Sequence, residues 1–348
     1  MSTVTLPGEV PPPPQFTKRD FVSDQTVRWC PGCGDYAILD AVQKVFAGLG
    51  IARENFVVVS GIGCSSRLPY YINSFGFHGI HGRAPAIATG IKVTRPELSV
   101  WVATGDGDGL SIGGNHILHA MRRNVDIKIL LFNNRIYGLT KGQYSPTSEA
   151  GKKTKTSPYG SVDLPVDPVA LALASGATFV ARCIDNYGEH LRQVLTRAAN
   201  HRGSAFIEIL QNCPIFNDGT FADVESRQER PDQALELQHG QPLLFGKNRD
   251  RGIRLTNFLP KTVALGDGGV AEEDLLRHDE ANPALSYLLC QMQHPEFPVP
   301  IGVFRSVERE PYDAAVHRQI REARAARQPG SLDSLLRQGD VWEAGAKA

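Results

Sequence analysis

Two polar motifs follow two apolar runs of the chain, and their residue types suit a divalent metal ion. Asp106 lies in GDGDG (105–109), and Asn134 ends the pair NN at 133–134. Mg2+ prefers oxygen ligands in octahedral geometry, usually one or two carboxylates together with substrate phosphates. The Asp106 carboxylate, the Asn134 amide oxygen and the backbone carbonyl of Ile136 would make half of such a shell. A diphosphate and a water would complete it.

The surroundings of the two motifs support this interpretation. The apolar runs at 98–103 (LSVWVA) and 127–132 (IKILLF) predict buried parallel strands. Both motifs then lie just past the carboxyl ends of strands, where open α/β sheets bind ligands. The glycines would let backbone N–H groups approach phosphate, and a helix expected from residue 110 would point its positive end there. The pair resembles the metal–diphosphate motif of thiamine-diphosphate enzymes; the alternative is two unrelated turns.

Four of the six cysteines are expected on loops at the same edge of the sheet. Cys30 and Cys33 form WCPGCG, Cys64 follows a strand that ends at residue 60, and Cys213 follows a strand that ends at residue 210. Four thiolates suit a 4Fe–4S cluster or a structural zinc ion. Unliganded thiols, or a redox pair at the CxxC, are the alternatives.

The two remaining cysteines, Cys183 and Cys290, lie in apolar segments and are expected to be buried and inert.

Composition excludes several classes of protein. The chain has 348 residues, of which 41% are apolar, and its 37 Lys and Arg balance its 37 Asp and Glu. A general nucleic-acid or membrane partner is therefore not expected. No apolar run reaches the roughly 18–20 residues of a membrane span. The N-terminal residues resemble no signal peptide. We expect a cytoplasmic protein without disulfides.

Strands and helices are expected to alternate along most of the chain, which predicts an α/β fold with a mostly parallel sheet covered by helices on both faces. The periodicity predicts helices at 35–49, 84–93, 110–122, 167–175 and 188–200, and strands at 56–59, 98–103, 127–132, 178–182 and 205–210. Residues 138–161 are rich in Gly, Ser, Thr, Lys and Pro, which is typical of a long functional loop or lid.

The pattern divides the chain into three parts. Residues 1–20 are a proline-rich N-terminal arm, stiffened by the prolines at 11–14. Residues 21–225 form the binding domain for the metal, the diphosphate and the four thiolates. Residues 226–348 are a C-terminal extension, expected to be irregular at 226–262, helical at 272–293 and 313–327, and mobile after 329. We expect this extension to be an arm that packs on the core or on a neighbouring chain.

Longer motifs make the resemblance specific. The segments WCPGCGDYAIL, SGIGCSSR, HGRAPAIATGIK, GDGDGLSIGGNH, FNNRIYGLTKGQYSPTS and QNCP occur in the same order as in the beta subunits of 2-oxoacid:ferredoxin oxidoreductases. The similarity extends over residues 22–310. It implies the thiamine-diphosphate-binding fold and an oxidative decarboxylation of a 2-oxo acid. That reaction yields acyl-CoA, CO2 and reduced ferredoxin.

The resemblance also implies roles for particular residues. It assigns cluster ligation to Cys30, Cys33, Cys64 and Cys213, and Mg2+ ligation to Asp106, Asn134 and the Ile136 carbonyl. It assigns thiamine diphosphate contacts to Ile62, Gly63, Cys64, Ser65, His81, Gly107, Asp108, Gly138 and Leu139. Leu139 would wedge the cofactor into its bent form. His81 is alternatively a histidine that caps a helix.

Two cations are candidates for binding the substrate. Arg67 lies three residues past Cys64, and Lys141 lies in the loop after Asn134. Arg67 stands where some relatives have Lys. Its planar guanidinium can grip a carboxylate with two hydrogen bonds, which suits the second carboxylate of 2-oxoglutarate. The alternative is that both side chains are simply solvated.

A carboxylate that activates thiamine, usually a Glu on a second α/β domain, has no counterpart here. In the similar enzymes an alpha subunit supplies that domain and helps to bind CoA, so we expect the site at a subunit interface. Electrons would leave from the single cluster to an external ferredoxin. The alternatives are a pyruvate:ferredoxin oxidoreductase subunit, a non-redox thiamine-dependent lyase with structural zinc, and a non-catalytic interaction subunit.

Overall fold

The structure is a computed structural model that describes residues 15–266, 269–327, 330–340, 342, 344 and 345. The prolines at 11–14, and most of the N-terminal arm expected at 1–20, lie outside the described residues.

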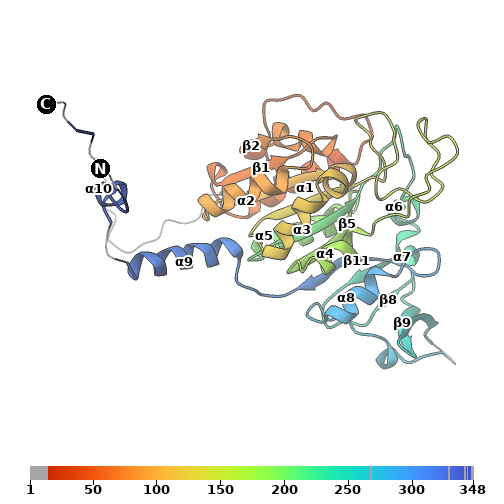
Figure 1. Cartoon of the computed structure of the whole chain (residues 1–348). Coiled ribbons are helices and arrows are strands. Elements are labelled where there is room, and N and C mark those ends of the chain that lie inside the picture. Colours follow the sequence, from red (N-terminus) through yellow and green to blue (C-terminus); the bar gives the residue numbers. More distant parts are fainter. Residues whose placement is uncertain (1–14, 267–268, 328–329, 341, 343, 346–348) are drawn as a thin grey trace, which may run out of the picture.

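An eight-stranded sheet forms the centre of the molecule, in the order β2-β1-β3-β4-β6-β5-β11-β7 (Figure 1). Every neighbouring pair is parallel except β5 with β11. The strands are β1 Phe56–Ser60, β2 Phe75–His78, β3 Ser99–Gly105, β4 Lys128–Asn133, β5 Phe179–Ile184, β6 Ala205–Leu210, β7 Ala234–Leu237 and β11 Val299–Ser306. Strands β1, β4, β5 and β6 are buried along their whole length, as apolar runs in a covered parallel sheet should be.

Helices cover both faces of this sheet, as the alternation of strands and helices predicts. Along β3, Val100 and Val102 face one apolar core while Trp101 and Ala103 face the other. The first core contains α2 Ala84–Thr94, α3 Gly114–Arg123, α4 Pro168–Ala174 and α8 Pro283–Cys290. The second contains α1 Asp35–Gly48 and α5 Gly188–Asn200. Shorter helical segments are α6 Ala222–Glu225, α7 Arg230–Gln233, η1 Lys18–Phe21, η2 Arg53–Asn55, η3 Ser65–Tyr71, η4 Asp108–Ile112 and η5 Glu272–Asp274.

Residues 226–262, expected to be irregular, contain strands. They form β7 of the main sheet and most of a separate antiparallel sheet of β8 Leu244–Phe245, β9 Arg251–Thr256 and β10 Leu259–Ala264. The expectation was wrong because these strands are short and β10 is largely exposed, so no long apolar period marks them. The edge strand β2 was missed for the same reason, since all four of its residues are exposed.

Two helices begin later than expected. The segment 272–293 is α-helical only in α8, because Pro283 occupies the first turn and the Asn282 side chain caps it, accepting a hydrogen bond from Leu285 N at 3.1 Å. The helix expected from residue 110 begins at Gly114, after the separate π-type turn η4.

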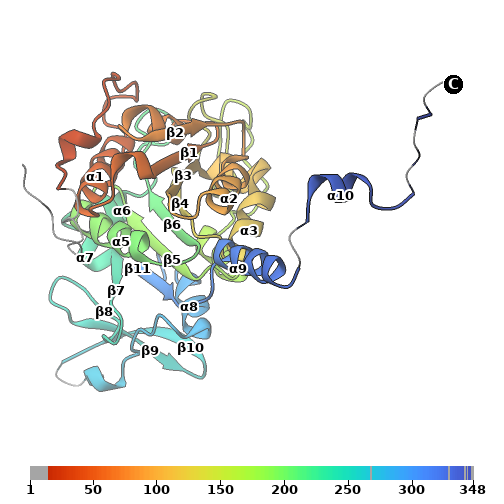
Figure 2. The same cartoon turned by 90° about the vertical axis from the view of Figure 1, so that its left-hand side faces the viewer.

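The C-terminal extension is partly integrated into the sheet. Strand β11 lies between β5 and β7, and Phe304 on β11 is fully buried beneath the guanidinium of Arg182. After β11, helix α9 Tyr312–Ala325 runs along α2, where its His317 side chain lies 2.8 Å from the carbonyl of Val93. Both views show α9 leading away from the sheet and α10 Leu332–Leu336 standing clear of it (Figures 1 and 2).

Across the part of the chain that the structure describes, no helix has the length and apolar character that a membrane span requires.

The burial of Phe304 gives a test of how firmly the extension belongs to the core. We expect Phe304→Ala to lower the free energy of unfolding by about 3–5 kcal/mol, because it opens a cavity in the core. Phe258→Ala, at a side chain that is 89% exposed, should change it by less than about 0.5 kcal/mol. Denaturant unfolding followed by circular dichroism measures both. An unchanged midpoint for Phe304→Ala would contradict the integration of β11.

Candidate functional site

The candidate site is a narrow cavity at the carboxyl ends of the central parallel strands. Its volume within this chain is about 40 Å3. The loops after β1, β3 and β4 supply most of its walls. Eleven residues predicted from the sequence line it: Ile62, Gly63, Cys64, Ser65, Asp106, Gly107, Asp108, Asn134, Ile136, Gly138 and Leu139. The structure therefore brings the two polar motifs and the GIGCSS segment together.

Asp106 is buried at the end of β3 and held from one side. Its Oδ2 accepts hydrogen bonds from the hydroxyls of Ser145, at 2.5 Å, and Thr147, at 2.8 Å. Burial raises the pKa of the Asp106 carboxyl to about 6, although these hydrogen bonds act to lower it. A nearby divalent cation would offset that burial and hold the group ionised.

The other two predicted metal ligands lie in a tight turn after β4. The Asn134 side-chain oxygen accepts a hydrogen bond from the backbone N–H of Ile136 at 3.2 Å. The Asn134 carbonyl accepts one from the Asn217 amide at 2.9 Å, which joins this turn to the loop after β6. Arg135, between them, has a positive φ of 55°. The turn points Asn134 and Ile136 into the same cavity as Asp106.

Asp108 differs from Asp106, because its carboxylate is occupied by the chain itself. Its Oδ1 accepts hydrogen bonds from the backbone N–H groups of Ile62, at 3.0 Å, and Gly82, at 2.7 Å. Its Oδ2 accepts one from the Thr104 hydroxyl at 2.6 Å. His81 is outside the cavity wall, with Nδ1 2.7 Å from Asp108 Oδ1 but without the angle of a hydrogen bond. Asp108 thus ties the loops after β1 and β2 to β3.

Two glycines are required by close contacts in these loops. A Cβ at Gly61 would lie 2.1 Å from the Asp108 carboxylate, and a Cβ at Gly107 would lie 2.2 Å from the Tyr137 ring. The Tyr137 hydroxyl donates to the Gly107 carbonyl at 3.0 Å, so the ring covers one end of the cavity. Larger residues at either position would displace the loops that form the walls.

Among the residues that the structure describes, several buried polar atoms of the cavity wall have no hydrogen-bond partner. They are Ser65 Oγ, Gln211 Oε1 and both carboxylate oxygens of Asp35, although the Cys33 thiol lies close enough to Asp35 to act against the rise in its pKa. Burial raises the pKa of Asp35 to about 7. Buried polar atoms are normally satisfied, so unpaired ones that share a cavity indicate the place of a polar ligand.

The structure places the sulfurs of Cys64 and Cys213 near one another, with the Cys30–Cys33 turn beside them. A Cβ at Gly138 would lie 3.5 Å from the Cys64 sulfur and 3.7 Å from the Cys213 sulfur. Trp29 Nε1 donates to the Cys64 carbonyl at 2.7 Å, and Gly34 N donates to the Asn212 carbonyl at 3.2 Å. These bonds join the Cys30–Cys33 turn to the loops that carry the other two cysteines.

The thiols share one electrostatic environment. Burial raises the pKa of Cys64 to about 12 and that of Cys33 further, and the neighbouring thiols and Asp35 act in the same direction. Metal coordination would reverse this, because it deprotonates a thiol. Cys183 and Cys290 are buried elsewhere, as expected.

The spacing of these side chains bears on the kind of metal centre. A single zinc ion holds its sulfur ligands about 2.3 Å away, and hence about 4 Å from one another. Among the described residues, no three His, Cys, Asp or Glu side chains are arranged to hold one ion.

The two candidate cations lie beside the cavity and not in its wall. Arg67 is half-buried in η3, and its backbone N–H donates to the Cys64 carbonyl at 3.2 Å. Lys141 is exposed in the turn after Gly138 and has a positive φ of 77°. Neither lines the cavity within this chain.

Sequence reasoning missed some residues of this site. Asp35, Gly105, Phe132, Tyr137 and Gln211 also line the cavity. Ser145 and Thr147, which hold Asp106, come from the long loop 138–161. Both hydroxyls lie in the SPTS segment and are buried in the structure, but nothing in the sequence distinguishes them from solvated loop hydroxyls.

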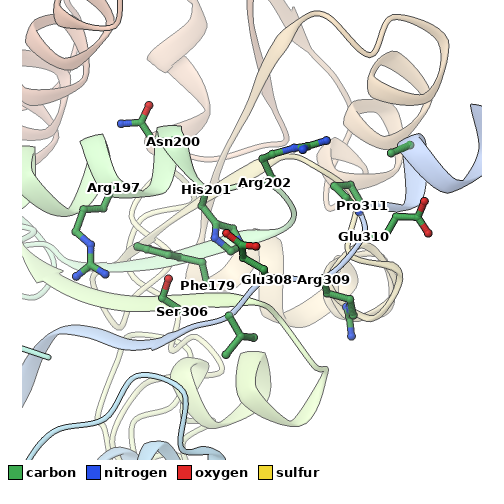
Figure 3. Close-up of a pocket in the computed structure, with 12 residues that line it drawn as sticks. Phe179, Arg197, Asn200, His201, Arg202, Ser306, Glu308, Arg309, Glu310 and Pro311 are labelled. Atoms are coloured by element: carbon green, nitrogen blue, oxygen red, sulfur yellow. The ribbon is translucent and has the colours of Figure 1, made fainter. Parts of the chain in front are cut away.

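A larger and more open concavity, of about 980 Å3, lies at the amino end of β5 and carries none of the predicted residues (Figure 3). Arg197 beside it already donates to both oxygens of Glu280, at 2.9 and 2.7 Å. Glu310 is likewise paired with Arg318 at 3.0 Å. We therefore assign it no part in the candidate site.

Comparisons with known proteins agree with the geometry. Residues 61–209 match the model of the thiamine pyrophosphate enzyme C-terminal TPP binding domain. The chain is 51% identical to the 2-oxoglutarate oxidoreductase subunit KorB of Mycobacterium tuberculosis, over 93% of this chain and 87% of the relative. It is 53% identical to 2-oxoacid:ferredoxin oxidoreductase 1 subunit beta of Aeropyrum pernix, over 55% of this chain and 60% of the relative.

A solved structure is also similar, with a TM-score of 0.75 and 33% identity. It is 2-oxoglutarate:ferredoxin oxidoreductase from Magnetococcus marinus with 2-oxoglutarate, coenzyme A and succinyl-CoA bound, and the match covers 93% of this chain and 96% of that one.

Proposed function

The chain belongs to the family of 2-oxoacid:ferredoxin oxidoreductase beta subunits, and from this membership we propose the reaction that it supports. It is the beta subunit of an oxidoreductase that converts 2-oxoglutarate and CoA to succinyl-CoA and CO2 and passes the electrons to ferredoxin. The observation that carries the proposal is one cavity lined by Asp106, Asn134, Ile136 and Cys64. A metal–diphosphate site and a thiol cluster thereby share a wall.

Asp106, Asn134 and the Ile136 carbonyl would hold Mg2+, and the loop glycines would hold the diphosphate. The Ser65 hydroxyl, which has no hydrogen-bond partner among the described residues, and the pKa of Asp106, which burial raises, both support this. When bound, thiamine diphosphate supplies the carbon nucleophile and the electron sink for decarboxylation. Ser145 and Thr147 fix one oxygen of Asp106, which leaves the other to face the cavity. Leu139, 45% exposed at the rim, suits the predicted wedge.

Cys30, Cys33, Cys64 and Cys213 would hold a 4Fe–4S cluster, which accepts and releases electrons one at a time. The position of Cys64 supports a short path between the two groups. Cys64 lines the cavity, and its sulfur faces Gly138 and lies near the sulfur of Cys213. The backbone around Cys64 is fixed by Trp29 and by η3, so the distance between the two groups is set by rigid protein.

The size of the cavity supports a second subunit. Ligand pockets commonly enclose about 300–1,000 Å3, whereas this chain alone encloses about 40 Å3. An alpha subunit that supplies the activating carboxylate and helps to bind CoA would form the remaining walls of the binding pocket. Arg67 and Lys141, beside the rim, would then face a substrate held between the chains. The cysteines are free, which suits the cytoplasmic location that we also propose.

Thr147 tests the metal–diphosphate site. Thr147→Val keeps the shape but removes a hydroxyl that donates to Asp106, and loss of an outer partner typically costs about 10–100-fold in metal affinity. We expect thiamine diphosphate to require that much more Mg2+ for binding, measured by equilibrium dialysis of the complex with its alpha subunit. Thr147→Ser, which retains the hydroxyl, should bind normally. Equal binding by the valine and serine variants would contradict the role.

The cluster assignment predicts a contrast between two buried cysteines. Anaerobically purified protein should contain about four irons per chain, as expected for a cubane held by four thiolates. Cys213→Ala should lose the iron and the absorbance near 400 nm, while Cys290→Ala should keep both. Iron and acid-labile sulfide analysis measures this. Stoichiometric zinc without iron would favour a non-redox lyase.

Arg67 tests the substrate. If its guanidinium binds the distal carboxylate of 2-oxoglutarate, Arg67→Met removes a charged hydrogen bond worth about 1.5–3 kcal/mol. We expect a roughly ten- to two-hundredfold loss in kcat/KM for 2-oxoglutarate and a much smaller loss for pyruvate, which lacks that carboxylate. The complex with the alpha subunit, assayed by ferredoxin reduction, provides the measurement. Equal losses would remove the reason for preferring 2-oxoglutarate.

A further inference from the structure

The group of four cysteines reaches the surface at one point. Cys30 is exposed, as are Pro31 and Gly32 after it, whereas Cys33 and Cys64 are half-buried and Cys213 is buried. A Cβ at Gly32 would lie 3.9 Å from the Pro214 ring, so the loop after β6 lies beside this turn. An electron on a cluster held by these thiolates would therefore be nearest to solvent at residues 30–32.

A lysine-rich loop adjoins this point. Residues 138–161 contain four lysines, Lys141, Lys152, Lys153 and Lys155, against a single acidic residue, in a chain whose formal net charge is zero. Gly138, at the start of the loop, packs beside the sulfurs of Cys64 and Cys213. A Cβ at Gly142 would lie 3.0 Å from the Phe216 ring, and the Lys152 ammonium donates to the Asn217 side chain. The loop is thus held against the segment that follows Cys213.

Two of the three lysines in the outer part of this loop have no acidic partner among the residues that the structure describes. Lys152 lies 3.7 Å from Glu149, the acidic residue of the loop. Lys153 and Lys155 are exposed and, within the residues that the structure describes, no carboxylate lies at salt-bridge distance from either. Ile215, 57% exposed between Pro214 and Phe216, adds a small apolar contact. The yellow-green loop extends past the strand ends (Figure 1).

We propose that the turn at residues 30–32, Ile215 and the outer lysines of the loop, Lys152, Lys153 and Lys155, form the docking surface for an acidic iron–sulfur electron carrier. This rests on the proposed function, whose electrons need an acceptor. One electron leaves the reduced cluster of this chain, which is thereby oxidised, and reduces the oxidised cluster of the carrier. Each 2-oxo acid releases two electrons, so this one-electron transfer occurs twice per turnover, to two carriers or to the two clusters of one carrier.

The physical character of this surface suits such a carrier. A reduced carrier must leave before an oxidised one can replace it, so it must dissociate quickly, and electron-transfer contacts are accordingly small. Complementary charge raises the association rate without requiring a large buried area. Exposed lysines around a small apolar centre supply that combination, and they favour a partner rich in carboxylates.

The test uses the complete complex with its cofactors and a purified acidic 2×4Fe–4S ferredoxin. The double variant Lys153→Glu/Lys155→Glu reverses the charge of the loop without changing a residue of the cavity. We expect the Kd for oxidised ferredoxin, measured by calorimetry without 2-oxo acid at low salt, to rise at least about tenfold, as a loss of near 1.4 kcal/mol or more would give. Salt should weaken binding of the unchanged complex much more than that of the variant.

A matched control reverses two exposed charges on the antiparallel sheet. Arg254→Glu/Lys261→Glu alters β9 and β10, which lie at the opposite end of the molecule from β1 and β2 (Figure 2). This variant should bind ferredoxin normally. Both variants should reduce methyl viologen at the rate of the unchanged complex, because that small dication needs no acidic docking face.

The outcomes separate the docking surface from the proposed function. Normal ferredoxin affinity in the Lys153/Lys155 variant, or an equal loss in the control, would overturn the docking surface while leaving the reaction intact. Loss of methyl viologen reduction in that variant would also overturn it, since the loop would then act in catalysis. An unchanged complex that reduces neither acceptor would instead refute the proposed function.

Discussion

The carboxylate of Asp108 holds the site together, although it faces its own chain more than the cavity. It receives N–H groups from Ile62 and Gly82 and the hydroxyl of Thr104, so a single buried charge fixes loops that follow three different strands. Hydrogen bonds to a charged acceptor are roughly twice as strong as neutral ones, and each donor here would otherwise be left unpaired in a dry region. Asp108 therefore anchors the loops that present Cys64 and Asp106 to one another.

A second set of buried polar contacts holds the carboxylate of Asp106. Thr147 lies at hydrogen-bond distance from both Asp106 and Asn133, and the Asn133 amide donates to Glu208 at 2.7 Å. Glu208 in turn accepts from Arg182 at 2.6 Å. Such a chain is stable only when every member is satisfied, so its residues depend on one another. These hydrogen bonds connect the end of β3 with β4, β6 and β5. The position of the Asp106 side chain therefore depends on buried residues in the middle of the sheet.

The sequence predicts the parts of this structure that are governed by strong local patterns. Apolar runs predicted β3, β4 and β6. Cys64 and Cys213 each follow the end of a strand, which predicted that both lie at the same edge of the sheet. Exposed strands such as β2 and β10 lack that signal, because their pairing partners and not their own residues define them. Thr147 and Asp35 were missed for a related reason. A buried hydroxyl or carboxyl in a loop looks like any solvated one until the fold reveals its neighbours, and the rim positions of Arg67 and Lys141 likewise depend on side-chain direction.

Strand β11 has a consequence for the order in which the chain folds during synthesis. In the sheet, β11 pairs with the edge of β5 that β6 does not cover. The ribosome makes β11 about ninety residues after β6. Until the ribosome has released residues 299–306, β5, a strand that is buried along its whole length in the finished fold, presents an unpaired edge, and such edges recruit other chains. The nascent protein therefore passes through an interval in which its binding loops are complete but its sheet is not. Protection of that edge, by a chaperone or by the adjoining subunit, would matter most during this interval.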